Sequence, residues 1–184
     1  MYSLDGFTWQ RGETLASNPE VLAAGIAVYL GIVLVLPKLL QGKAVPPPTF
    51  LAATHNLVLC LGSAVMFVGC AYEAVKEIVR SRDSTWLFCL PLDTKVEGPL
   101  WFWSYVYYLS KYYELLDTVI LILKCRPLSF LHVFHHSVVL AMAYFWLDSA
   151  QSLQVMGLLF NTGVHVVMYY YYFLCTVKRA PKWK

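Results

Sequence analysis

Charged residues are scarce in this sequence: Asp, Glu, Lys and Arg make up 14% of its 184 residues, and hydrophobic residues make up 59%. A soluble domain carries about 25% charged residues. The charges are also unevenly placed, so that four long segments contain none: residues 21–37, 44–72, 127–147 and 149–177. A helix needs about 20 apolar residues to cross a bilayer. The composition therefore excludes a soluble globular protein.

A fifth apolar stretch lies between Glu97 and Lys124, interrupted only by Lys111, Glu114 and Asp117. With the uncharged segments it predicts an all-α integral membrane protein, a multi-span helical bundle with five spans. We expect these spans at residues 21–37, 49–72, 99–123, 128–147 and 151–177, with a loop at 73–98 and a tight turn at Asp148. Because the spans use most of the chain, residues 1–184 are expected to form a single membrane domain.

Lysine and arginine alternate between loops in a way that predicts the orientation in the membrane. The side reached after the first, third and fifth spans has no acid and eight cations: Lys38, Lys43, Lys124, Arg126, Lys178, Arg179, Lys182 and Lys184. The other side has nine acids. Because basic loops stay in the cytosol, we expect the N-terminus to be lumenal or exterior and the C-terminal end of this chain to be cytosolic.

Cysteine provides no recognisable motif. The five cysteines contain no CxxC pair, and none stands within a polar cluster of the sequence: Cys60, Cys70, Cys89, Cys125 and Cys175. Neither a zinc site nor a redox motif is indicated.

Polar side chains interrupt three of the expected spans, where ionisable groups are costly and usually functional. The three clusters are Lys111-x-x-Glu114-x-x-Asp117-Thr118, His132-x-x-His135-His136 and Asn161-x-x-x-His165-x-x-Met168-Tyr169-x-Tyr171-Tyr172. Spacings of three and four keep each cluster largely on one side of its helix. At about 1.5 Å per residue, Glu114 lies about 13 Å, His135 about 10 Å and His165 about 18 Å from the cytosolic end of its span. We therefore expect one polar layer in a chamber open to the cytosol.

Simpler interpretations of some of these residues stay open. Lys111 and Glu114 are spaced for an ion pair within one helix. Tyrosine is enriched at membrane interfaces, so a structural belt and a substrate lining are equal alternatives for Tyr169 and Tyr172. His55 is expected to be an interface or packing residue near a span end, with the alternative that it reaches the chamber together with Asn56.

The three clusters resemble motifs of the very-long-chain fatty acid elongases, the ELO-type membrane 3-ketoacyl-CoA synthases. The family motifs KxxExxDT, HxxHH and NxxxHxxMYxYY are matched by residues 111–118, 132–136 and 161–172, in that order. The resemblance implies a multi-pass enzyme of the endoplasmic reticulum membrane. This acyltransferase would join a long-chain acyl-CoA with malonyl-CoA and release CoA and CO2. It implies no cofactor, no metal and no nucleic acid, and it suggests other elongation enzymes or a second copy of the chain as partners in the bilayer.

For this condensation, the lack of a cysteine in the polar clusters favours an imidazole nucleophile. We expect His135 to take the acyl group, with His165 opposite it. His132 and His136 would orient groups or donate protons, and Glu114 or Asp117 would fix a tautomer. Lys111 would neutralise a carboxylate. The expected substrate contacts are Lys111, Asn161, Tyr169 and Tyr172, with Lys178, Arg179, Lys182 and Lys184 either binding the CoA phosphates or serving only as a topology signal.

The family pattern has seven spans and a TxxQxxQ motif at the start of the sixth, which is not present here. We therefore expect a chain truncated before the last two spans, and an inactive truncated protein is one alternative. A metal-dependent desaturase or hydroxylase is another, because four histidines and two carboxylates are enough to ligate iron. The single HxxHH motif weighs against it. A transporter or scaffold is a third, and the lack of internal repeats weighs against a transporter.

Overall fold

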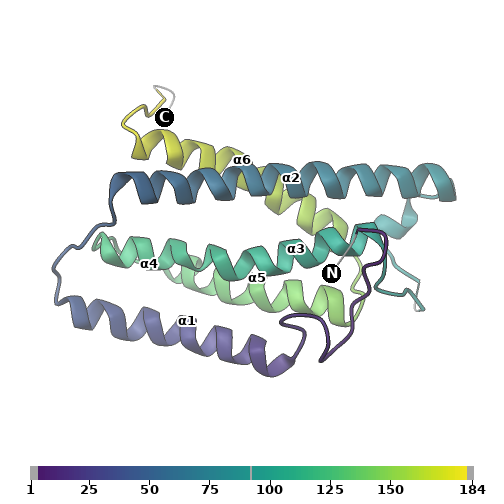
Figure 1. Ribbon diagram of the computed structural model, residues 1–184, viewed down its shortest axis with the longest axis horizontal. Helices are drawn as coiled ribbons and strands as arrows, with labels where there is room; N and C mark the ends of the chain where they lie inside the picture. The colour runs from purple at the N-terminus through teal and green to yellow at the C-terminus, as the bar shows by residue number, and fades with distance from the viewer. Residues whose placement is uncertain (1–3, 92, 182–184) are drawn as a thin grey trace.

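The computed structural model describes residues 4–91 and 93–181, and it is built from helices (Figure 1). In chain order they are α1 (Pro19–Leu40), α2 (Thr49–Ser81), the short 3-10 helix η1 (Thr85–Leu87), α3 (Pro99–Glu114), α4 (Leu116–Leu123), α5 (Phe130–Asp148) and α6 (Gln154–Thr176). The described residues form no β-strand, only an isolated bridge between Thr8 and Glu97. The predicted all-α fold is confirmed.

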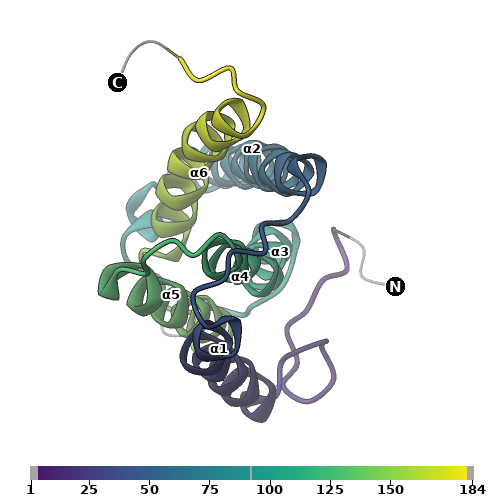
Figure 2. The same ribbon diagram turned by 90° about the vertical axis from the view of Figure 1, so that its left-hand side faces the viewer.

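The long helices lie side by side along one axis. Helix α2 packs most extensively against α6, α3 packs against α5, and α1 contacts α4 and α5. Seen along the axis, α3 and α4 stand between α1 on one side and α2 with α6 on the other (Figure 2). The α1–α2 and α4–α5 connections share one end of the bundle with the C-terminal end of α6 (Figure 1). The basic loops therefore lie together, and we call this the basic end.

Three helices are long and apolar enough to cross a membrane by length and composition, namely α1, α2 and α5. The expected span at 99–123 is divided at Leu115 into α3 and α4. Helix α6 has the required length, with polar residues such as Asn161 and His165 along it. Each of the five expected spans is thus largely helical, and the chain is a helical membrane protein. That all five cross the membrane stays a prediction.

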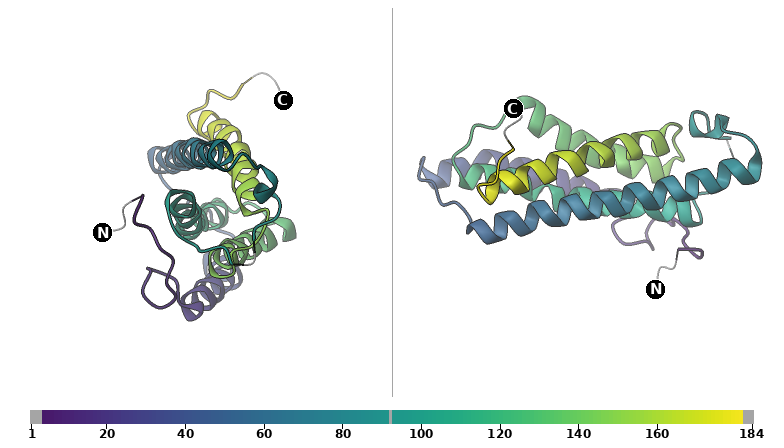
Figure 3. Two further views of the ribbon diagram at one scale, coloured as in Figure 1. Left: turned by 90° about the vertical axis from the view of Figure 1, so that its right-hand side faces the viewer. Right: turned by 90° about the horizontal axis from the view of Figure 1, so that it is seen from above.

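Helix α2 is longer than the sequence predicted. It was expected to end at Tyr72 but continues to Ser81, so the prediction of a loop at residues 73–81 is wrong. Two ion pairs at spacing i,i+3, Glu73 with Lys76 and Glu77 with Arg80, run along the extra turns. The 33 residues of α2 rise about 50 Å, whereas the hydrocarbon layer is about 30 Å thick. The last turns therefore extend beyond that layer, and they project past α6 in Figure 3.

The segment before α1 folds over the end of the bundle opposite the basic end (Figure 1). Phe7 is 1% exposed and its ring stacks on Tyr105, with centroids 5.2 Å apart. Trp9 packs edge-on against the same tyrosine. Arg11 forms an ion pair with Asp148, and the hydrogen bond and charge of Asp148 raise the pKa of Arg11. Asp148 is the last residue of α5, and the short turn to α6 follows it directly, in agreement with the prediction.

Candidate functional site

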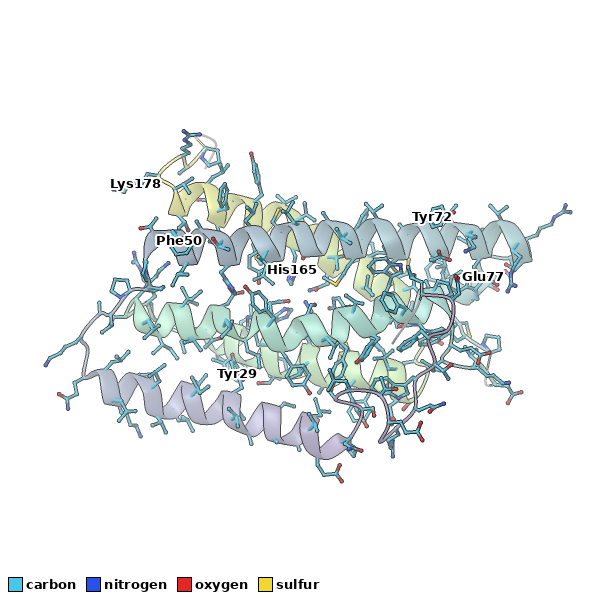
Figure 4. The ribbon with its side chains drawn as sticks, in the orientation of Figure 1. Tyr29, Phe50, Tyr72, Glu77, His165 and Lys178 are labelled. Atoms are coloured by element: carbon cyan, nitrogen blue, oxygen red, sulfur yellow. The ribbon has the colours of Figure 1, made fainter. Side chains whose placement is uncertain are left out.

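A cavity of about 780 Å³ lies between α2, α4, α5 and α6, with Glu114 of α3 in its wall. His165 stands in the middle of the bundle beneath α2 (Figure 4). Apolar side chains such as Leu121, Val164 and Met168 form part of the lining. Nine of the predicted site residues also line it: Glu114, Asp117, His132, His135, His136, Asn161, His165, Tyr169 and Tyr172. The three sequence clusters therefore converge on one cavity.

Lys111 and Glu114 form an ion pair on α3, and their side chains are only 4% and 3% exposed. Lys111 Nζ also donates to Asn161 Oδ1 of α6 at 3.1 Å and lies 4.3 Å from the centre of the Tyr107 ring. A buried charge is tolerated when it is paired and hydrogen-bonded, and each of these contacts contributes to that. The pair is more than an intrahelical contact, because it joins α3 to α6.

A second group of hydrogen bonds is formed around Asp117 of α4. Its carboxylate accepts from the hydroxyl of Tyr169, and its Oδ1 lies 2.8 Å from His55 Nε2. His55 is 6% exposed, so it is a buried partner of the polar layer rather than an interface residue. Its neighbour Asn56 donates to Thr176 Oγ1 at 3.1 Å and lines the cavity. Asn56 thus reaches the chamber, whereas His55 does not line it and contacts it only through Asp117.

The three histidines of α5 have different surroundings. His132 Nε2 lies 2.8 Å from Thr118 Oγ1, which is 3.1 Å from the hydroxyl of Tyr29 on α1. Figure 4 shows Tyr29 on the side of α1 that faces the bundle. His136 is buried, with its ring 4.4 Å from that of His132. His135 lies in the cavity wall and has no hydrogen-bond partner among the described residues.

His165, on α6, is 5% exposed and has two polar neighbours. Its Nε2 is 3.3 Å from Asn161 Nδ2 and 3.6 Å from Glu114 Oε1. Glu114 is therefore the carboxylate nearer to His165, whereas Asp117 bonds to His55. His135 and His165 line the same cavity from different helices, α5 and α6.

The two tyrosines considered for an interfacial belt differ. Tyr169 is 1% exposed and donates to Asp117, so a belt role does not hold for it. Tyr172 is 45% exposed and lines the cavity. Both alternatives remain compatible with the position of Tyr172.

The cations nearest the cavity are not those that the sequence suggested. Lys124 and Arg126, at and just after the end of α4, line it. Lys178 and Arg179 follow α6 and are not part of the lining, and Figure 4 shows Lys178 at the outer end of that helix. Lys182 and Lys184 lie outside the described residues. The geometry therefore favours Lys124 and Arg126 as contacts for an anionic group at the cavity.

One cysteine lies closer to the polar layer than expected. Cys175 of α6 lines the cavity, whereas Cys125 does not. All five cysteines are free thiols. Cys175 is therefore the cysteine against which an imidazole nucleophile has to be tested.

Potential metal ligands occur at several places in residues 4–91 and 93–181. Within those ranges no three His, Cys, Asp or Glu side chains are grouped so that they could share a metal ion. Several of the side chains that would be ligands are instead bonded to one another or to hydroxyls, such as His55 to Asp117 and His132 to Thr118.

The fold and site together define a class: helical membrane proteins with a histidine-lined polar cavity that approaches the basic end. The chain belongs to the ELO family, described as the GNS1/SUR4 family, whose model matches residues 14–184. The resemblance seen in the motifs is confirmed by this match.

Individual relatives agree with the family assignment. The chain is 37% identical over 178 residues to a Dictyostelium discoideum protein with the provisional name of fatty acid elongase, covering 97% of this chain and 60% of the relative. It is 34% identical to fatty acid elongase sre1 of the same organism, covering 96% and 66%. It is 30% identical to the Arabidopsis thaliana protein fatty acid elongase 3-like, covering 91% and 63%. The chain thus spans about three-fifths to two-thirds of the length of these relatives.

Proposed function

We propose that this protein catalyses the condensation step of fatty acid elongation, in which a long-chain acyl-CoA and malonyl-CoA give a 3-ketoacyl-CoA, CoA and CO2. One observation carries the proposal: His135 and His165 line one cavity beside the buried Lys111–Glu114 pair. The names of the relatives, fatty acid elongases, point to the same pathway.

In the first step, an unprotonated nitrogen of His135 attacks the carbonyl carbon of the acyl-CoA thioester. The carbon–sulfur bond breaks, and the proton from the other ring nitrogen goes to the sulfur, so that CoA leaves as the thiol. His135 suits this role because no described residue engages its ring nitrogens by a hydrogen bond. A neutral imidazole is a competent nucleophile near neutral pH.

In the second step, malonyl-CoA loses its carboxylate as CO2 and the electron pair forms an enolate. The enolate carbon attacks the acyl group, the bond to His135 breaks, and the imidazole recovers a proton from the cavity. Hydrogen-bond donors stabilise the enolate oxygen. His132, His136 and His165 are the donors that this wall of the cavity offers.

Both substrates would enter from the basic end. Lys124 and Arg126 stand where the cavity lining approaches that end, so they are suited to CoA phosphates. The acyl chain would pack against Leu121, Val164 and Met168, and burial of each CH2 group contributes about 0.8 kcal/mol.

The location of the protein follows from the same proposal. A soluble CoA substrate requires the basic end to face the cytosol, which agrees with the distribution of lysine and arginine. We propose the endoplasmic reticulum membrane as the site, with other elongation enzymes or a second copy of the chain as partners. The mechanism as written uses no metal, so activity is expected to survive treatment with a chelator.

The test is release of CoA from acyl-CoA in the absence of malonyl-CoA, measured with a thiol reagent. Transfer to an imidazole releases one CoA per active site, whereas direct attack of the enolate on the bound thioester releases none. His135→Ala is expected to abolish the release, and Cys175→Ala is expected to leave it intact. If Cys175→Ala lost this CoA release and His135→Ala kept it, the acyl group would be assigned to the thiol and the proposal would be contradicted.

A further inference from the structure

We propose that Tyr107 and Lys111 fix the orientation of the Asn161 amide, and that Asn161 in turn holds His165 as the tautomer with its proton on Nδ1. The amide orientation and the tautomer are properties of the resting protein. Their consequence for catalysis rests on the proposed function.

The orientation of Asn161 follows from the chemistry of its neighbours. Tyr107 OH donates to Asn161 Oδ1 at 3.0 Å, and Lys111 Nζ donates to the same oxygen at 3.1 Å. An ammonium group has donors and no acceptor, so the atom that faces it has to be the amide oxygen. A flipped amide would place its NH2 group against the lysine and leave buried donors without an acceptor, which costs about 1–3 kcal/mol.

The fixed amide determines which nitrogen of His165 carries the proton. Asn161 Nδ2 lies 3.3 Å from His165 Nε2. Because the amide can only donate through this atom, a neutral imidazole has to accept at Nε2. The proton of the neutral ring then resides on Nδ1, since the hydrogen bond at one ring nitrogen determines the state of the other.

Glu114 is the neighbour of His165 that would favour a proton on Nε2. Its Oε1 is 3.6 Å from His165 Nε2, beyond the distance of a normal hydrogen bond. Its Oε2 accepts from Lys111, which also balances its charge. The carboxylate is therefore committed to the lysine, and the amide is the closer partner of Nε2.

The tautomer separates the roles of the two histidines that line the cavity. The lone pair on Nε2 of His165 is occupied by the amide, so this nitrogen is a poor acceptor for an acyl group. His165 instead has an N–H at Nδ1, which suits it to donate to a carbonyl or enolate oxygen. His135, without a hydrogen-bond partner among the described residues, remains as the acyl acceptor. Tyr107 and Lys111 are thus positioning residues, and they act through Asn161.

The experiment is nitrogen NMR of the protein in lipid nanodiscs, with 15N in the histidine rings. Protonated and unprotonated ring nitrogens have well-separated shifts, and the His165 signals are those missing from His165→Gln. In the wild type we expect an unprotonated Nε2 and a protonated Nδ1. A proton on Nε2, whether in the other tautomer or in a doubly protonated ring, would overturn the proposal.

Variants of Asn161 and of its partners Tyr107 and Lys111 test whether the amide sets the tautomer of His165. Asn161→Asp replaces the donor by a carboxylate oxygen, so the proton is expected on Nε2. Asn56→Asp makes the same chemical change elsewhere in the cavity wall and is expected to leave the His165 signals in place. The combined Tyr107→Phe and Lys111→Met change keeps the asparagine but releases its orientation, so both tautomers are expected. An unchanged spectrum in Asn161→Asp would show that the amide does not set the tautomer, and an unchanged spectrum in the combined variant would show that Tyr107 and Lys111 do not fix the amide.

This readout does not depend on turnover. A chain with the expected spectrum but no CoA release would contradict the proposed function and leave the tautomer assignment standing. A chain that releases CoA but has the proton on Nε2 would contradict the tautomer assignment and leave the proposed function standing.

Discussion

The two halves of α3 are stabilised by different kinds of contact. Its first half places Trp101 and Tyr105 in an apolar core that the segment before α1 covers. Its second half places Lys111 and Glu114 in the polar layer, among partners from α6. Stability at the first end comes from packed volume, and at the second end from paired charges and directed hydrogen bonds. A loss at the packed end should therefore affect folding alone, whereas a loss at the polar end should affect folding and chemistry together.

The strongest test of this contrast removes one partner of the buried pair. Glu114→Ala leaves the Lys111 ammonium buried without its counter-charge, which is expected to lower the free energy of unfolding by about 3–5 kcal/mol and abolish activity. The measurement is denaturant unfolding in detergent micelles, followed by circular dichroism. The matched control is Glu73→Ala, which breaks a pair of the same i,i+3 spacing with a largely exposed lysine and should have little effect. Equal effects of the two changes would contradict the contrast.

At the packed end, Phe7→Ala removes a ring that is 1% exposed and stacks on Tyr105. The expected loss of stability is about 3–5 kcal/mol, as for other buried aromatic residues. The kcat per folded molecule should stay at the wild-type value, because Phe7 does not line the cavity. Thermal unfolding and CoA release on the same sample check both parts. A lower kcat at full folding would show that the two ends are coupled.

A smaller and more selective change removes a single hydroxyl, once from the polar layer and once from the packed core. Tyr169→Phe deletes the donor to Asp117 and is expected to lower kcat about tenfold, equivalent to about 1.4 kcal/mol. Tyr144→Phe deletes a hydroxyl that donates to the carbonyl of Ser17 at 3.0 Å, and kcat should not change. Steady-state kinetics of the two variants, with unfolding curves as the control for stability, makes the comparison. The contrast would fail if Tyr144→Phe lowered kcat as far as Tyr169→Phe.

The smallest expected effect is at the cavity mouth. Reversing the charge of Lys124 and Arg126 should raise the KM for acyl-CoA about fivefold, with a smaller effect at high salt because the ions screen the contact. Reversal of Lys178 and Arg179, which do not line the cavity, should leave KM unchanged. A rise in KM only for the second pair would support the sequence prediction and contradict the assignment from the cavity.

Much of the architecture was accessible from the sequence, because the bilayer imposes long apolar helices and makes each interruption conspicuous. The clusters around Glu114, His135 and His165 stood out for this reason, and they do meet in one cavity. Helix spacing indicated which side chains share a face. The depth expected for each cluster stays a prediction.

What the sequence missed depends on contacts between helices far apart in the chain. His55 and Asp117 are 62 residues apart, and a lone histidine near a span end has no pattern that predicts such a bond. The same holds for Tyr29, which reaches His132 through Thr118. The extension of α2 has a signal in the sequence, the i,i+3 charge pairs after Tyr72, but mixed charges after an apolar segment also predict a loop.

The proposed mechanism requires His135 to carry the acyl group. It is tested most directly by mass spectrometry of peptides from protein incubated with acyl-CoA alone and quenched quickly. We expect an acyl mass on the peptide containing His135, absent from His135→Ala and still present in Cys175→Ala. An acyl mass on Cys175, or no adduct on either residue while the wild-type protein makes product, would contradict it.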